Sequence, residues 1–151
     1  MEKEYIYTAS PAESEAAGAR LAARLLSDKG LPRYVALYGD LGVGKTAFVR
    51  GVASVLCPGA AVRSPTFALV HEYRGQLPVF HFDMYRITDE DDLYSIGYDD
   101  YLARNGVILV EWSENIPYAL PERYLRVTIR KNDPTNTESR EILLEEVCDP
   151  C

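Results

Sequence analysis

The chain has 151 residues, of which 47% are hydrophobic, and this predicts one globular domain over residues 1–151 with a single core. Its net charge of −7 argues against direct binding of nucleic acid, so we expect any nucleic acid to be held by a partner. Apolar runs reach only about five residues, too short to span a membrane. The acidic beginning has no hydrophobic leader, so we expect a cytoplasmic protein.

The first half of the chain predicts two strand-to-helix units. Residues 5–8 alternate as a short edge strand, and a capping box at residues 10–13, with proline at the first helical position, begins a helix. Gly30 and Pro32 end this helix, whose apolar residues recur at helical spacing: Ala12, Ala16, Ala19, Ala23 and Leu26. A buried strand at residues 34–38 leads through a glycine-rich loop into a helix at residues 45–56 with its own apolar stripe.

The second half predicts mostly strands. Residues 68–73 and 79–84 form two of them, joined by a turn near Gly75, and short helices follow at residues 88–94 and 98–104. Residues 107–110 are fully apolar, as in a central parallel strand. Residues 125–129 and 142–144 form a hairpin around a polar turn at residues 132–136. We therefore predict an α/β fold of the P-loop NTPase type: a mixed, mainly parallel sheet flanked by helices, with a C-terminal antiparallel hairpin.

The loop at residues 39–46 matches the phosphate-binding pattern G-x-x-x-x-G-K-S/T. Glycines let successive backbone N–H groups point inward at a polyphosphate, and the dipole of the following helix favours negative charge. We expect Lys45 to reach the terminal phosphates and the Thr46 hydroxyl to hold Mg²⁺. The predicted nucleotide-binding residues are Gly39, Asp40, Leu41, Gly42, Val43, Gly44, Lys45, Thr46 and Ala47, together with Trp112.

Two carboxylates stand at the ends of predicted strands, Asp83 and Glu111. Ligands of open α/β sheets bind at the carboxyl ends of the strands. If both strands flank strand 34–38, both side chains point toward the loop. One carboxylate would then assist Thr46 in holding Mg²⁺ and the other would order the attacking water, with Lys45 completing the catalytic set.

Several other residues admit two interpretations. Trp112 either lies against a nucleotide base or the phosphate site, or fills the core. His81 is best interpreted as a packed strand histidine, His71 is undetermined, and Arg86 reaches either the phosphates or a structural ion pair. The acidic residues 89–92 form either a solvated helix start or a partner-docking patch.

The three cysteines, Cys57, Cys148 and Cys151, are interpreted as structural or incidental. A zinc site needs about four ligands, and no second pair or nearby histidine completes one. A redox C-x-x-C pair opens a helix in a βαβ unit, which a chain terminus does not supply.

Taken together, the motifs GDLGVGKTAFVRG, SPTF, HFDMYR and VEW resemble the bacterial TsaE family, in which they occur in the same order. The resemblance covers residues 5–130. It implies a mixed α/β sheet, ATP and ADP with Mg²⁺, and a partnership with the TsaD–TsaB heterodimer, which transfers a threonylcarbamoyl group to an adenosine next to the tRNA anticodon. The resemblance also implies that ATP hydrolysis resets that complex between catalytic cycles. By motif, Ser64 and Thr66 correspond to a switch-like segment, Asp83 to the strand-end carboxylate, and Glu111 and Trp112 to the rest of the site.

Three other classes of protein have some of these sequence features. A small-molecule kinase has the same loop but usually an arginine-bearing lid, and no such segment is evident. A GTP-driven switch usually carries N-K-x-D, which is absent from the sequence. A scaffold with a vestigial site would not need Lys45, Thr46, Asp83 and Glu111 intact. The sequence leaves self-association open.

Overall fold

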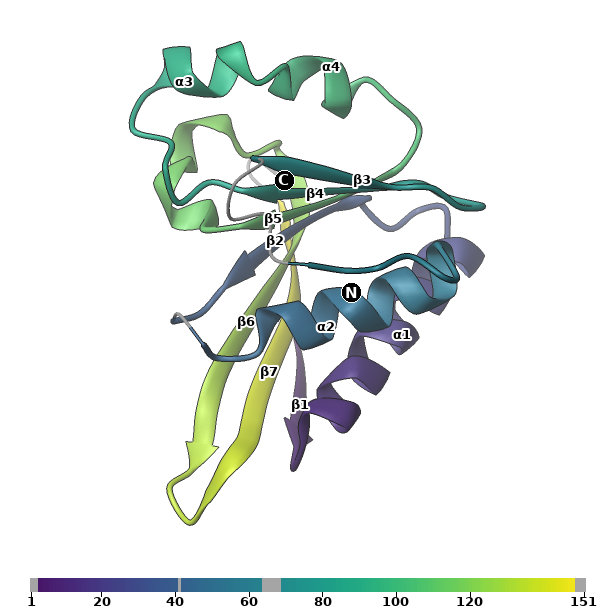
Figure 1. The fold of residues 1–151 in the computed structure, drawn as a ribbon, viewed down its shortest axis with the longest axis vertical. Coiled ribbons are helices and arrows are strands. Elements are labelled where there is room, and N and C mark those ends of the chain that lie inside the picture. Colours follow the sequence, from purple (N-terminus) through teal and green to yellow (C-terminus); the bar gives the residue numbers. More distant parts are fainter. Residues whose placement is uncertain (1–2, 41, 64–68, 149–151) are drawn as a thin grey trace.

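The computed structural model describes residues 3–40, 42–63 and 69–148. Their strands form one seven-stranded sheet in the order β1-β7-β6-β2-β5-β4-β3 (Figure 1). The strands are β1 (Glu4–Thr8), β2 (Tyr34–Tyr38), β3 (Val70–Tyr73), β4 (Val79–Asp83), β5 (Val107–Glu111), β6 (Arg123–Asp133) and β7 (Asn136–Cys148). The helices are α1 (Pro11–Ser27), α2 (Lys45–Leu56), α3 (Glu90–Ser95) and α4 (Tyr98–Leu102), with 3₁₀ turns η1 (Ser113–Asn115) and η2 (Pro117–Ala119).

The sheet is parallel at its centre and antiparallel at its margins. Strand β2 pairs in parallel with β5 on one side and β6 on the other, and β5 pairs in parallel with β4. The β6–β7 hairpin, the β1–β7 pair and the β3–β4 pair are antiparallel. The predicted α/β class with a parallel core and a C-terminal antiparallel hairpin is therefore confirmed.

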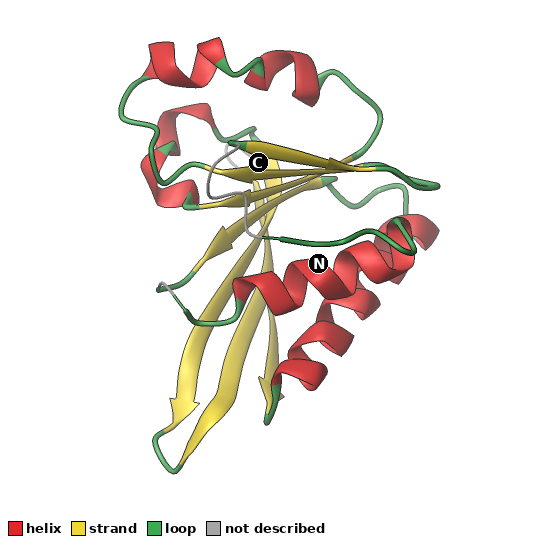
Figure 2. Cartoon of the chain, viewed as in Figure 1, coloured by secondary structure: helices red, strands yellow, loops and turns green. Residues whose placement is uncertain are grey.

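Helices cover both faces of the sheet, as Figure 2 shows. Because successive residues of a strand point to opposite faces, β2 contributes to two cores. Val35 and Leu37 pack with α1 and α2, whereas Tyr34 and Ala36 pack with the side of the sheet covered by α3, α4 and the segment after β5. The apolar sequence of β2 is thus explained by burial on both sides.

Helix α1 begins as predicted, since the Ser10 hydroxyl accepts a hydrogen bond from the backbone N–H of Glu13 at 3.3 Å. The face predicted to be apolar is wrong, however: Ala12, Ala16 and Ala23 are exposed. The buried face consists of Ser14, Ala17, Gly18, Leu21, Ala22 and Leu25. Alanine is frequent on every side of this helix, so the larger leucines and the close approach of α2 determine which side is buried.

Helices α1 and α2 approach each other through one glycine on each. A Cβ atom added to Gly18 would lie 2.1 Å from the backbone oxygen of Phe48 on α2. One added to Gly51 would lie 1.8 Å from the backbone oxygen of Glu15 on α1. The two backbones are therefore in contact, and this pair of helices forms a compact layer under β2.

The acidic residues 89–92 begin α3. Asp89 is the N-cap and accepts a hydrogen bond from the backbone N–H of Asp92 at 2.8 Å, while Glu90 and Asp91 are exposed. These residues thus form a solvated helix start, and the docking of a partner on them stays a hypothesis. Across the ranges that the structure describes, no helix combines the length and the hydropathy that crossing a membrane would need.

Candidate functional site

The glycine-rich loop (residues 39–44) joins β2 to α2 at the carboxyl end of the central strand (Figure 1). Gly39, Gly42 and Gly44 have φ angles of 144°, 77° and 102°, in the region that L-residues rarely adopt. Gly44 is the N-cap of α2, and no side chain caps this end of the helix. The first N–H groups of α2 are thus available to a ligand.

The C-terminal hairpin of β6 and β7 packs against this loop. A Cβ atom on Gly39 would lie 2.6 Å from the backbone oxygen of Ile129 in β6. From β7, the Arg140 Nε donates a hydrogen bond to the backbone oxygen of Val43 at 2.6 Å. The hairpin therefore contacts the loop at both Gly39 and Val43.

Lys45 is the first residue of α2 and is only 5% exposed. Its Nζ donates a hydrogen bond to the Gly39 carbonyl at 2.9 Å, across the loop. The same ammonium lies 4.6 Å from the centroid of the Trp112 ring, a cation–π distance. A charged group so placed can be redirected to an anion bound in the loop.

Trp112 directly follows β5 and has a φ of 59°, the only positive φ of a residue other than glycine in the described ranges. Such backbone strain is concentrated at functional sites. The ring is half-buried against the core on the α3 side and lies 4.9 Å from the ring of Tyr85. Trp112 thus packs against the core and also covers Lys45, and its contact with a nucleotide stays a prediction.

The structure places the other predicted loop residues around Lys45. Thr46 is half-buried, whereas Val43 and Ala47 are buried and Asp40 and Gly42 are exposed. Leu41 lies outside the described residues, as do Ser64 and Thr66 of the predicted switch segment.

The two strand-end carboxylates lie side by side. Asp83 and Glu111 are in register on the paired strands β4 and β5. The condition that both strands flank β2 is met by β5 but not by β4, which is one strand further out. Asp83 is therefore the more distant of the two in the sheet, although it still feels the charge of Lys45.

The pKa of Asp83 is raised, chiefly by burial and further by the negative charge of Glu111. A backbone hydrogen bond from Tyr85 to Asp83 Oδ1, at 2.9 Å, and the charge of Lys45 act in the opposite direction. Two adjacent carboxylates of this kind attract a cation, and oxygen donors are the ligands that Mg²⁺ prefers.

A family model described as "Threonylcarbamoyl adenosine biosynthesis protein TsaE" matches residues 8–142. The chain belongs to the TsaE family. It is 41% identical over 112 residues to a tRNA threonylcarbamoyladenosine biosynthesis protein TsaE from Bacillus subtilis, covering 74% of this chain and 68% of that protein. A Haemophilus influenzae protein of the same name is 38% identical over 113 residues, covering 74% and 70% of the two chains.

The fold agrees with this assignment. The crystal structure of Bacillus subtilis YdiB superposes with a TM-score of 0.72 at 32% sequence identity, covering 97% of this chain and 86% of that one. The resemblance found in the motifs is therefore confirmed at the level of the family and of the fold.

His81 is a packed strand histidine, as interpreted, but it also contacts the site. Its side chain is fully buried, and its Nε2 lies 2.6 Å from the Glu111 Oε2. Its Nδ1 lies 3.3 Å from the hydroxyl of Tyr73 in β3. Within β4 the sequence shows only that His81 and Asp83 share one face of the strand, and the contact with Glu111 depends on the pairing of β4 with β5.

Other residues near the site were not predicted. Arg140 approaches from the hairpin, beyond the motifs. Glu114, in η1, feels the charges of Lys45 and Asp40, and burial raises its pKa. No local pattern marks either residue, since each reaches the loop from a separate part of the chain.

The structure does not bring the remaining candidate residues into the site. Arg86 is exposed, and His71 lies edge-on to the Tyr73 ring with a pKa lowered mainly by burial. Cys57 is buried and free, and its thiol donates to the backbone oxygen of Tyr73 at 3.3 Å. Cys151 lies outside the described residues, among which no cluster of three or more His, Cys, Asp or Glu side chains suits a metal.

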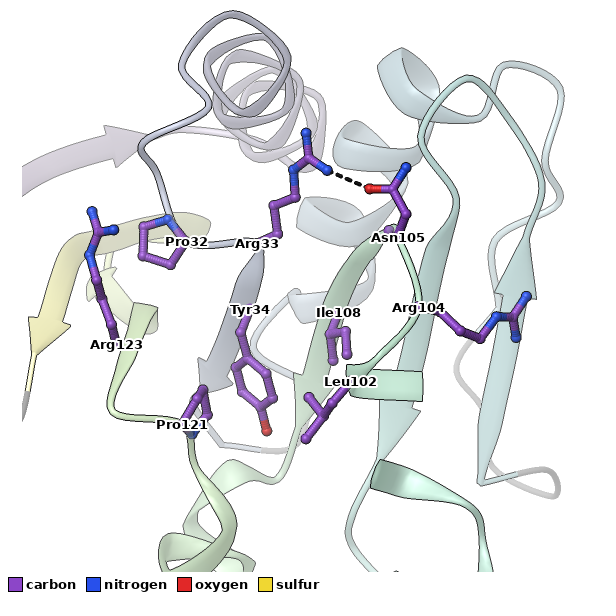
Figure 3. A pocket seen from close by; sticks show the side chains of 10 residues that line it. Pro32, Arg33, Tyr34, Leu102, Arg104, Asn105, Ile108, Pro121 and Arg123 are labelled. Carbon is purple, nitrogen blue, oxygen red and sulfur yellow. Dashed lines mark hydrogen bonds between the residues drawn. The ribbon is translucent and has the colours of Figure 1, made fainter. Parts of the chain in front are cut away.

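A pocket of about 470 Å³ lies at the opposite, amino-terminal end of β2 and β5 (Figure 3). Three arginines line it, and each is already bound: Arg33 to Asn105, Arg104 to Glu72, and Arg123 to Glu146. Ligands of parallel sheets bind at the carboxyl ends of strands, so this pocket is separate from the candidate site.

Proposed function

We propose that this chain is a Mg²⁺-dependent ATPase that acts in the threonylcarbamoyladenosine modification of tRNA next to the anticodon, on the TsaD–TsaB complex. The observation that carries the proposal is the buried Lys45 ammonium, which lies across the glycine-rich loop and beside Trp112 and acts electrostatically on the strand-end carboxylate Asp83. Membership of the TsaE family supports the pathway.

The residues present fit ATP or ADP with Mg²⁺. Positive φ angles at the three glycines and the uncapped start of α2 provide backbone donors for phosphates. The Thr46 hydroxyl, Asp83 and Glu111 provide oxygen donors for the cation. The metal would neutralise charge on the phosphates, while Lys45 would bind the terminal phosphate and one of the two carboxylates would hold the attacking water.

The partners in this proposal are the TsaD and TsaB proteins. The net charge of −7 supports contact with tRNA mainly through them, and a cytoplasmic location is part of the same proposal. We infer that the partner stimulates hydrolysis by completing the site and excluding water.

The test is ATP hydrolysis by the purified chain with Mg²⁺, alone and with a TsaD–TsaB heterodimer. We expect the heterodimer to stimulate hydrolysis and Lys45→Ala to reduce it on the order of 100- to 1000-fold, because a charge that stabilises the transition state is lost. Lys29→Ala, at an exposed position after α1, is the matched control and should hydrolyse normally.

Undiminished hydrolysis by Lys45→Ala would refute the assignment of the loop. Hydrolysis that ignores the heterodimer would refute the regulatory role. If ATP consumption rose with an added metabolite and yielded a phosphorylated product, the protein would be a small-molecule kinase instead.

A further inference from the structure

A buried chain of hydrogen bonds leads away from Glu111. The carboxylate contacts His81 at 2.6 Å, and His81 contacts the Tyr73 hydroxyl at 3.3 Å. That hydroxyl in turn binds the main chain of Arg63, accepting from its N–H at 3.3 Å and lying 3.2 Å from its carbonyl oxygen. We call Glu111, His81 and Tyr73 the buried polar chain.

Strand register puts all three side chains on one face of the sheet. Glu111 is paired with Asp83, and His81 lies two residues before Asp83 on the same strand. His81 is paired with His71, and Tyr73 lies two residues after His71. This face also holds the apolar core beneath α1 and α2. The polar chain therefore crosses the end of an otherwise apolar layer.

These three side chains are closed off from solvent. Exposure is 0% for His81, 5% for Glu111 and 7% for Tyr73. His81 bonds through both ring nitrogens, Nε2 to Glu111 and Nδ1 to the Tyr73 hydroxyl, and the single proton of that hydroxyl is directed to the Arg63 carbonyl oxygen. Buried polar groups that are bonded at both ends have fixed positions.

Only one oxygen of Glu111 is used in this way. Its Oε2 is bound to His81, and among the described residues no hydrogen bond reaches its Oε1. The polar chain thus holds the carboxylate by one oxygen and leaves the other for a ligand. If the contact served packing alone, an apolar side chain would fill the same space at lower cost.

We propose that His81 and Tyr73 are positioning residues for Glu111, and that they set its carboxylate for the hydrolytic step from an anchor on the Arg63 backbone. This inference rests on the proposed ATPase function and deepens it. Neither residue touches nucleotide. They act on the rate of the bound complex through Glu111, as residues behind a reacting carboxylate do.

The first test removes one hydroxyl. Tyr73→Phe keeps the ring and should lower kcat about 3- to 10-fold at saturating Mg²⁺, with the KM for ATP and the nucleotide affinity within about twofold of the wild type. Tyr98→Phe is the matched control, since it removes a buried hydroxyl bound to Tyr34 on the other face of the sheet. It should lose stability and keep kcat.

The second test is a double-mutant cycle. His81→Phe should lower kcat about 10- to 100-fold, and His81→Gln, which can place a donor near Glu111, should recover part of that loss. In a Glu111→Gln background, His81→Phe should cause no further loss, because His81 acts through the carboxylate. If the double variant loses kcat by the product of the losses of the two single variants, the proposal is overturned.

Lys45→Ala, measured in the same assay, separates the two claims. If Lys45→Ala is inactive while Tyr73→Phe and His81→Phe both keep wild-type kcat, the positioning role is wrong and the ATPase proposal stands. If Lys45→Ala is as active as the wild type, the proposed function itself fails. Should His81→Phe not fold, Tyr73→Phe still decides the question.

Discussion

At the scale of single residues, Asp83 is costly to the folded protein. Burial raises its pKa above the value in the unfolded chain, so ionising this carboxyl lowers the free energy of unfolding. The cost is absent below about pH 4 and is complete once the pH has risen past the folded-state pKa. This is a cost that a bound cation would offset.

Asp83→Asn should therefore stabilise the protein without nucleotide. Asparagine keeps an oxygen for the Tyr85 N–H and removes the charge, so we expect the melting temperature at about pH 7.5 to rise by a few degrees. The gain should shrink as the pH falls through the folded-state pKa of Asp83. Thermal unfolding of both proteins across this pH range measures it, and a gain independent of pH would contradict the charge as its cause.

Trp112 offers a direct probe of nucleotide, because it is the single tryptophan of the chain. With the Lys45 ammonium 4.6 Å from its ring, its emission should change when Lys45 turns toward a bound phosphate. We expect titration with Mg²⁺ and ATP to change the emission, and Lys45→Ala to alter the emission of the free protein and abolish that response. Calorimetric saturation without any change in emission would show that Lys45 stays on the ring.

Spacing alone identified the glycine-rich loop and the helix that follows it. A local motif specifies the loop because its chemistry depends on successive backbone positions from Gly39 to Thr46. The contact between His81 and Glu111 depends on the register of two strands 30 positions apart, which no local spacing contains. The same reason explains why Arg140 was missed.

At the scale of elements, the α1–α2 pair has the least room for change. A methyl group on Gly51 would meet the backbone of Glu15 at 1.8 Å, and backbone cannot move aside as a side chain can. Gly51→Ala should lower the free energy of unfolding by about 1–3 kcal/mol, in spite of the better helix propensity of alanine. Denaturant unfolding followed by circular dichroism measures this change.

The control for this substitution is Gly30→Ala. An added Cβ there would meet only the Asp28 carboxylate at 3.1 Å, a contact that a side chain can relieve. We expect its unfolding midpoint to stay near that of the wild type. Equal midpoints for Gly51→Ala and Gly30→Ala would mean that the helices do not approach as closely as described.

At the scale of the whole molecule, the number and type of the main elements could be predicted, but their order in the sheet could not. Burial and periodicity identified strands such as β2 and β5 because these signals depend on local sequence. The position of β4, one strand away from β2, depends on which neighbours pair. The buried face of α1 was likewise decided by its partner helix.

The strand order also determines when the fold can be completed. The central strand β2 is held on one side by β6, and β1, near the start of the chain, pairs with β7 near its end. During synthesis, residues 123–148 leave the ribosome after all other strands, so β1 has no partner and β2 has one open edge until then. Folding with such distant contacts is slow and exposes unpaired edges. The nascent polypeptide is therefore vulnerable to aggregation until β6 and β7 have been translated, and the contacts of the hairpin with the glycine-rich loop form only after that point.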